Sequence, residues 1–151
     1  MFDVASASQA AQAGTLEEWI HTYLTTGDWA NAGLAYGLKL QSRWWRGPLE
    51  LSLAALTRCC GPEPEMEYVM DATAWAGRID ALAATLVDAR ALPPLIVEYR
   101  QGELSVRDGN KRHAAMSQRG WRQCWVLIWY NSSDDYARDA HARGADPESG
   151  L

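Results

Sequence analysis

The chain has 151 residues, a formal net charge of −5, 48% hydrophobic residues and 22% charged residues. A chain of this length and apolar content is typical of one globular domain with a core of its own, and not of a disordered protein. Its apolar runs are too short to span a membrane, its first residues lack a secretory pattern, and its three cysteines suggest no disulfide framework. We therefore expect a cytoplasmic protein, and the acidic balance weighs against a dedicated DNA-binding function.

Residues 1–46 are expected to form a helical extension. The first 14 of them are small and polar, and we expect them to be frayed. A capping box that starts at Thr15, followed by an apolar face, predicts a helix that ends near Gly27. Asp28 can cap a second helix that runs to Trp45, so the whole segment is expected to be a helical hairpin.

Residues 47–131 are expected to alternate between strands and helices. The expected strands are 48–53, 95–99, 103–107 and 124–130. The expected helices run from Asp71 or Thr73 to the residues before Pro93, and from an N-cap at Asn110 to about Arg119. The last strand is nearly continuous in apolar residues, which favours a central strand buried on both faces. With a short helix near 134–142 and a polar tail in the remaining residues 132–151, this order predicts one compact α+β unit.

The most informative segment is the turn that begins at Asp108. A strand ends there, Gly109 turns the chain, and a helix begins, so free backbone N–H groups and the positive end of the helix dipole are exposed. Acidic residues are favoured in such a first turn, whereas this chain has three basic residues there. Each cation costs about 0.3–1 kcal/mol unless an anion binds nearby, so we predict a phosphate site. The residues predicted to hold the phosphate are Gly109, Asn110, Lys111, Arg112 and His113.

The same turn leaves several roles open for its charged side chains. Asp108 can hold a metal-bound water, a ribose hydroxyl or the guanidinium of Arg112. The alternative for the basic residues is that they face solvent or pair with one of three carboxylates, Glu50, Glu98 or Glu103. Glu50 and Glu98 lie on or beside expected strands, and either is a candidate catalytic base toward a substrate hydroxyl.

Six segments follow one another in a characteristic order between Pro48 and Tyr130. They are Pro48–Leu53, Arg78–Leu82, Leu92–Val97, Leu104–Ala115, Gly120 and Trp125–Ile128. The order is an opening strand, a helix, a second strand, a short hairpin, a DGxxRxxA turn and helix, and a closing strand. This pattern resembles the ParB/sulfiredoxin superfamily. The resemblance implies a small mixed sheet flanked by helices, to which the helices of residues 1–46 are an added extension.

The resemblance also implies a ligand, a nucleoside di- or triphosphate such as CTP, ATP or ADP, often with Mg²⁺. Gly109 matches the turn glycine of the family and Arg112 its most regular phosphate-contacting arginine, while Asp108 would assist the metal. Partition proteins have a G-E-R-R-x-R box, and Asn110, Lys111 and Ala114 replace its Glu and two of its Arg residues. The acidic side chain linked to CTP hydrolysis and the reactive cysteine of sulfiredoxins are therefore both missing at this turn.

Three functions from different classes are compatible with these residues. The leading hypothesis is nucleotide binding at the turn. The second is phosphoryl transfer to a small hydroxylated substrate, as in the free-serine kinases of the superfamily, or slow nucleotide hydrolysis. The third is an adaptor that handles DNA, or that binds a protein or a second copy of the chain through the N-terminal helices. The chain after Tyr130 is expected to be too short for the helix-turn-helix domain of a partition protein, which makes DNA the weakest of these partners.

Two further pairs of residues are open to both a packing and a functional interpretation. Cys59 and Cys60 lie in a Gly/Pro-rich loop that is near the nucleotide in the family, and burial is favoured over a reactive thiol. Trp44 and Trp45 can stack on a base, although such a pair more often packs a helix against a sheet.

Overall fold

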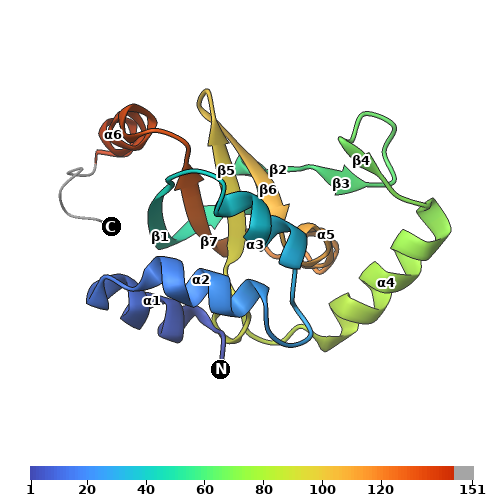
Figure 1. Cartoon of the computed structure of the whole chain (residues 1–151). Coiled ribbons are helices and arrows are strands. Elements are labelled where there is room, and N and C mark those ends of the chain that lie inside the picture. Colours follow the sequence, from blue (N-terminus) through green and yellow to red (C-terminus); the bar gives the residue numbers. More distant parts are fainter. Residues whose placement is uncertain (145–151) are drawn as a thin grey trace.

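The structure is a computed structural model that describes residues 1–144, and it is built around a five-stranded mixed sheet (Figure 1). Its strands are β1 (Trp44–Ser52), β2 (Thr57–Arg58), β5 (Leu95–Arg100), β6 (Glu103–Asp108) and β7 (Gln123–Tyr130). The strand order is β1-β7-β5-β6-β2, with β5 parallel to β7 and β2 parallel to β6, and the other neighbours antiparallel. A separate two-stranded parallel ladder joins β3 (Cys60–Gly61) and β4 (Tyr68–Val69).

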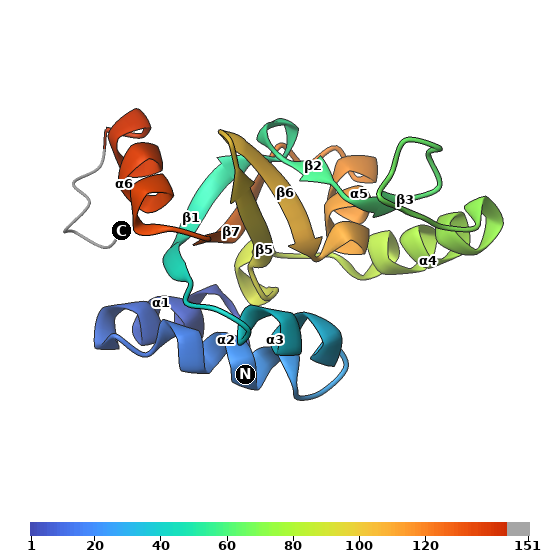
Figure 2. The same ribbon diagram turned by 45° about the horizontal axis from the view of Figure 1, so that its top comes forward.

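Helices cover both faces of the sheet, which confirms the α+β class expected from the sequence (Figures 1 and 2). They are α1 (Val4–Ala13), α2 (Leu16–Leu24), α3 (Ala32–Leu38), α4 (Ala72–Thr85), α5 (Asn110–Gln118) and α6 (Ser133–Ala142). Two 3-10 turns, η1 (Leu53–Ala55) and η2 (Ala89–Ala91), connect some of these elements. Helices α1–α3 lie together at one face, whereas α4 and α5 pack on the other. Every helix of residues 1–144 is too short or too polar to cross a bilayer.

The interior strands β5 and β7 divide their side chains between two cores. On β5, Ile96 faces the helices α2 and α3, while Val97 faces α4 and α5. On β7, Leu127 and Ile128 divide in the same way, because successive side chains of a strand point to opposite faces. All four side chains are fully buried, so the prediction that residues 124–130 form an interior strand buried on both faces is confirmed.

The expectation that residues 1–14 are frayed is wrong. They form α1, whose N-cap Asp3 accepts a hydrogen bond from the backbone N–H of Ser6 at 2.8 Å, in a reciprocal capping box. Val4 and Ala7 of this helix are fully buried. The composition of the segment does not predict this, but Val4 and Ala7 are spaced so that both face one side of a helix.

The expected helical hairpin is also wrong, because the second helix ends at Leu38 and is part of a group of three. Trp44 and Trp45 instead begin β1 and pair with Tyr130 and Trp129 of β7. The Trp45 and Trp129 rings are 6.2 Å apart, and such cross-strand aromatic pairs stabilise a sheet. The two tryptophans therefore pack within the sheet. The boundary expected between residues 46 and 47 falls inside β1.

Some of the remaining elements follow the sequence, but the loop expected around Cys59 contains the short strands β2 and β3, and the helix expected to run up to Pro93 ends at Thr85 and is followed by η2. Asp71 caps α4 by accepting a hydrogen bond from Ala74 N–H at 2.9 Å, as one of the two predicted caps. The hairpin β5–β6 and the helix near residues 134–142 are confirmed. The polar tail expected at the C-terminus lies outside the described residues from position 145 onward.

Candidate phosphate-binding cleft

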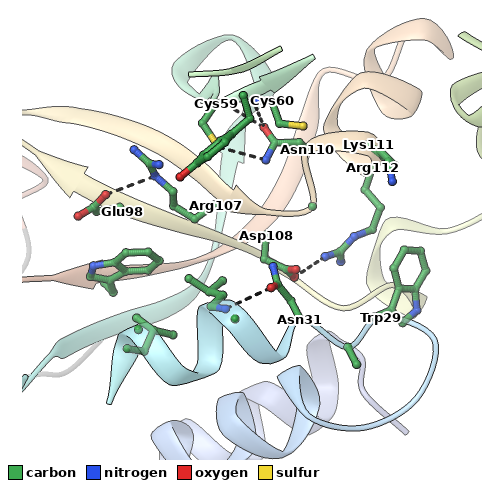
Figure 3. A pocket seen from close by; sticks show the side chains of 18 of the residues that line it. Trp29, Asn31, Cys59, Cys60, Glu98, Arg107, Asp108, Asn110, Lys111 and Arg112 are labelled. Carbon is green, nitrogen blue, oxygen red and sulfur yellow. Dashed lines mark hydrogen bonds and ion pairs between the residues drawn. The ribbon is translucent and has the colours of Figure 1, made fainter. Parts of the chain in front are cut away.

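A cleft of about 800 Å³ lies between the N-terminal helices and the sheet, at the start of α5 (Figure 3). Its walls come from the loop before α3, from α3 itself, from β5 and β6, from the β3–β4 ladder and from the first turn of α5. The charged residues that line it are Arg43, Arg100, Arg107, Lys111 and Arg112, and Asp28, Glu98 and Asp108. Five cations thus face three carboxylates, and two of the cations, Arg100 and Arg107, also pair with Glu67 outside the lining, so a smaller excess of positive charge remains in a chain with net charge −5.

Gly109 sets the direction in which α5 leaves the sheet. Its φ of 101° is in the left-handed region, and it is the N-cap of the helix, which no side chain caps. A Cβ at this position would overlap Leu95 Cδ2 and lie 3.0 Å from Arg112 Nη2, so the turn admits only glycine without displacing its neighbours. The N-terminus of α5 consequently opens into the cleft with its backbone donors uncapped by side chains.

Asn110 has a different role from the predicted N-cap, because it is the first residue of the helix. Its Oδ1 accepts hydrogen bonds from the backbone N–H groups of Cys59 at 2.9 Å and Cys60 at 3.3 Å. Its Nδ2 donates to Val106 O at 3.1 Å. The side chain of Asn110 therefore fixes the segment after β2 to the start of α5, and its contribution to a phosphate site comes from its backbone N–H.

Arg112 is almost completely buried, with 1% of its surface exposed, yet its guanidinium lines the cleft. Nη2 donates to Asp108 Oδ2 and to Tyr23 Oη, both at 2.9 Å, and Nη1 donates to Pro93 O. The ring of Trp29 covers the guanidinium at 4.8 Å from Cζ. Nε has no hydrogen-bond partner within residues 1–144. Of the roles open to Asp108, the structure shows the one in which it pairs with Arg112.

Lys111 and His113 differ in their relation to the cleft. Lys111 lines it and forms no hydrogen bond or ion pair with any residue that the structure describes. His113 does not line it, because its Nε2 lies 3.0 Å from Leu53 O on the far side of the helix. Burial first, and the charge of Arg58 second, lower the pKa of His113 against the effect of the Leu53 carbonyl. The structure thus brings Lys111, but not His113, to the predicted site.

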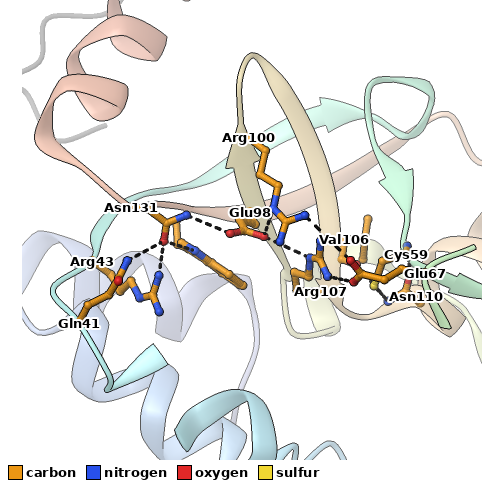
Figure 4. Close-up of polar contacts among 11 residues, drawn as sticks. Gln41, Arg43, Cys59, Glu67, Glu98, Arg100, Val106, Arg107, Asn110 and Asn131 are labelled. Atoms are coloured by element: carbon orange, nitrogen blue, oxygen red, sulfur yellow. Dashed lines mark hydrogen bonds and ion pairs between the residues drawn. The ribbon is translucent and has the colours of Figure 1, made fainter. Parts of the chain in front are cut away.

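The two candidate bases lie in different places. Glu98 is a buried carboxylate at the cleft wall, where Oε1 accepts from Arg100 Nε at 2.8 Å and faces Arg107 Nε at 3.3 Å (Figure 4). Its Oε2 accepts from Asn131 Nδ2 at 2.9 Å. Glu50 is an exposed residue of β1 that does not line the cleft. Glu98 is therefore the one of the two candidates that lies in the cleft, where Arg100, Arg107 and Asn131 hold its carboxylate, and Glu50 lies outside the cleft.

At this turn, Asp108 is the carboxylate predicted to hold Mg²⁺. No group of three His, Cys, Asp or Glu residues among positions 1–144 could hold a metal ion. Oδ2 of Asp108 already accepts hydrogen bonds from Tyr23 and Arg112. Mg²⁺ is usually held by one or two carboxylates together with phosphate oxygens and water. Among the described residues nothing donates to Oδ1 of Asp108, so this oxygen is the one that could hold the ion together with phosphate oxygens and water, and Mg²⁺ binding by Asp108 stays a prediction.

Cys59 and Cys60 both line the cleft; Cys59 is buried next to Asn110, and Cys60 is half-buried. Burial, followed by the proximity of Cys59, raises the pKa of Cys60 above its usual value. A thiol with a raised pKa is a poor nucleophile at neutral pH, which agrees with the interpretation of this pair as packing residues.

Sequence reasoning missed Tyr23, Trp29 and Arg107 as residues of the site. Tyr23 is on the apolar face of the helix predicted from Thr15, where nothing in the local pattern distinguishes its hydroxyl. Arg107 directly precedes the turn motif and alternates with the buried Val106 and Asp108 on β6. Its place next to the motif is therefore a signal that the sequence does contain. Trp29 follows Asp28, which was interpreted as a helix cap, but it belongs to the loop between α2 and α3.

Comparison with solved structures finds eight similar chains, and ParB proteins are among them. The C-terminally truncated chromosome-partitioning protein ParB from Caulobacter crescentus, complexed with CTP-γ-S, matches with a TM-score of 0.40 and 13% identity over 63% of this chain and 53% of its own. A Pnob8-like ParB-N domain matches with a TM-score of 0.41 and 17% identity over 68% of this chain and 38% of its own.

This chain thus spans about half, or less, of the length of these neighbours. No protein-family model and no curated protein sequence matches it.

Proposed function

We propose that this chain binds a nucleotide through its phosphates at the first turn of α5. The observation that carries the proposal is the uncapped N-terminus of this helix, which opens into a cleft with an excess of cations. The first backbone N–H groups of a helix have no acceptor within it, and the helix dipole places about half a positive charge there. Lys111, which has no partner in the described chain, and the unsatisfied Nε of Arg112 add donors to the same turn.

The size and lining of the cleft favour a nucleotide over a phosphate ion alone. Its volume of about 800 Å³ is within the range of roughly 300–1,000 Å³ found for small-molecule sites. Two exposed aromatic residues, Trp29 and Tyr68, line it, and aromatic rings can stack on a base. The ParB of Caulobacter crescentus was solved with CTP-γ-S, and the sequence resemblance implies CTP, ATP or ADP as the ligand class.

The two lysines of the chain provide a matched test. Calorimetric titration with CTP, ATP, ADP and GTP should detect binding of at least one nucleotide to the wild-type chain. Lys111→Ala should weaken it about 10- to 100-fold, because a charge-assisted hydrogen bond contributes about 1.5–3 kcal/mol. Lys39→Ala is the control, since Lys39 is an exposed residue at the end of α3 that does not line the cleft. Absence of binding by all four nucleotides, or equal affinities of the two variants, would refute the proposal.

Phosphoryl transfer or slow hydrolysis is the second candidate, because the carboxylate of Glu98 lines the same cleft. Phosphorus NMR of the chain with nucleotide and a pool of hydroxylated metabolites should then show a new phosphate ester or free phosphate. Glu98→Gln should abolish this change, and an unaltered nucleotide after long incubation would leave binding as the function. Contacts of α1–α3 with a protein partner or a second copy, and contacts with DNA, stay predictions.

A further inference from the structure

Tyr23 of α2 connects the N-terminal helices to the proposed phosphate turn. Its side chain is fully buried, and its hydroxyl donates to Asp108 Oδ2 at 2.8 Å while accepting from Arg112 Nη2 at 2.9 Å. Asp108 and Arg112 are themselves joined at 2.9 Å, so the three polar groups close a ring of hydrogen bonds. A segment that resembles an extension in sequence therefore supplies one of the direct partners of Arg112.

The ring of Tyr23 is held in place from within the N-terminal helices. It stacks on Trp19 with centroids 5.4 Å apart and lies 5.6 Å from Phe2. Burial, the largest cause, raises the pKa of the hydroxyl well above its ordinary value. The group is consequently protonated across the physiological range, and it can donate to a carboxylate and accept from a guanidinium at the same time.

We propose that Tyr23 is a positioning residue of the phosphate site, and that helices α1–α3 are part of the binding site and not an appendage. This inference rests on the proposed function. Arg112 has a long side chain with many rotamers, and within residues 1–144 its Nη2 has two acceptors, one of which is the Tyr23 hydroxyl. Trp29, in the loop that follows α2, covers the same guanidinium at 4.8 Å. Loss of the hydroxyl should therefore let the guanidinium move away from the phosphate while the fold is retained.

The chain contains a second tyrosine in a similar setting, which makes a matched control. The Tyr130 hydroxyl donates to Asp139 Oδ2 and accepts from Arg46 Nε at 3.2 Å. These three residues connect β1 and β7 to α6, and none of them lines the cleft. Tyr130→Phe therefore removes the same kind of buried hydroxyl as Tyr23→Phe, but outside the proposed site.

The experiment measures the affinity of the full chain for pyrophosphate, which presents phosphate groups without a base, by calorimetry. We expect Tyr23→Phe to raise the dissociation constant about 3- to 10-fold, which corresponds to the loss of one hydrogen bond. Tyr130→Phe should leave it within twofold of the wild type. A readout that reports position and not stability is the NMR signal of the Arg112 Nε–H group, assigned with Arg112→Lys. Pyrophosphate should shift the Arg112 Nε–H signal in the wild type and in Tyr130→Phe. In Tyr23→Phe this signal should be weak or broadened, because the guanidinium is no longer held in one position.

Each outcome of this comparison decides one question. If the wild type binds pyrophosphate and both variants bind as well as it does, Tyr23 does not position the site, and the proposed function stands. If both variants lose affinity equally, the effect is one of general stability, and the positioning role is refuted. If the wild type binds neither pyrophosphate nor any of the four nucleotides, the proposed function fails, and the role of Tyr23 fails with it.

Discussion

The glycine at the start of α5 allows the geometry of the turn to be tested quantitatively. Gly109→Ala forces a side chain into a backbone with φ of 101°, which costs about 1–2 kcal/mol for an L-residue. The new Cβ would also overlap Leu95 Cδ2 and lie 3.0 Å from Arg112 Nη2. Overpacking of this kind costs about 1–3 kcal/mol. The expected loss in the free energy of unfolding is therefore about 2–5 kcal/mol.

The other end of the same helix offers the control. Gly120 also has a left-handed φ, of 77°, but a Cβ there would meet no atom within 4 Å. Gly120→Ala should thus lose only the conformational part, about 1–2 kcal/mol. Urea unfolding followed by tryptophan fluorescence measures both variants, and the free energies are extrapolated to water.

The difference between the two variants isolates the close packing at the turn. Equal losses would show that the space around Gly109 is not tight, which would refute the described packing of the turn against Leu95 and Arg112. Because the new Cβ pushes on the guanidinium, Gly109→Ala should also weaken nucleotide binding, whereas Gly120→Ala should not. A destabilised Gly109→Ala variant with wild-type affinity would contradict the placement of the ligand at this turn.

Three further predictions concern buried groups. Arg112→Met should reduce the free energy of unfolding by about 3–5 kcal/mol, because it leaves the buried carboxylate of Asp108 without its counter-charge. The double variant Arg112→Met with Asp108→Asn should regain part of this loss. The free energy of unfolding should fall as the pH drops below about 6.5, the ordinary pKa of histidine, because the unfolded chain protonates His113 while the folded chain keeps it neutral. His113→Gln should reduce this fall. Iodoacetamide at pH 8 should modify the half-buried Cys60 well before Cys124, since burial raises the pKa of Cys124 to about 12.

These three predictions fail on separate observations. Urea curves in which the double variant is no more stable than Arg112→Met would contradict the described ion pair. A pH profile of unfolding that His113→Gln does not change between pH 7 and pH 5 would exclude a buried neutral imidazole. Mass spectra with Cys124 modified as fast as Cys60 would contradict the burial of that strand.

The fold could be predicted largely where local patterns are strong. The hairpin β5–β6, the cap of α4 and the interior strand β7 follow from alternation, capping residues and a continuous apolar run. The start of β1 could not be predicted in this way, because Trp44 and Trp45 become strand residues only through pairing with the distant β7. Tertiary contacts override a local helical pattern in such cases.

The site was predicted in part, for a similar reason. The left-handed glycine is a local feature that the turn motif indicates, whereas the predicted side-chain cap at Asn110 is wrong because Gly109 is the N-cap and no side chain caps the helix. The partners of its side chains are not local, since Tyr23 is 89 residues from Arg112 in the sequence and the backbone of Cys59 is 51 residues from Asn110. The pairing of Arg112 with Asp108 is one of the roles that the sequence left open for Asp108, and local sequence alone could not decide among them.

The most direct test of the proposed function is an NMR titration of the isotope-labelled chain with CTP and with ATP. The account predicts that the largest changes in chemical shift occur at the backbone amides of Gly109, Asn110, Lys111 and Arg112, with smaller changes along the walls of the cleft. A spectrum in which these four amides do not move, while the added nucleotide shifts residues elsewhere or none at all, would contradict it.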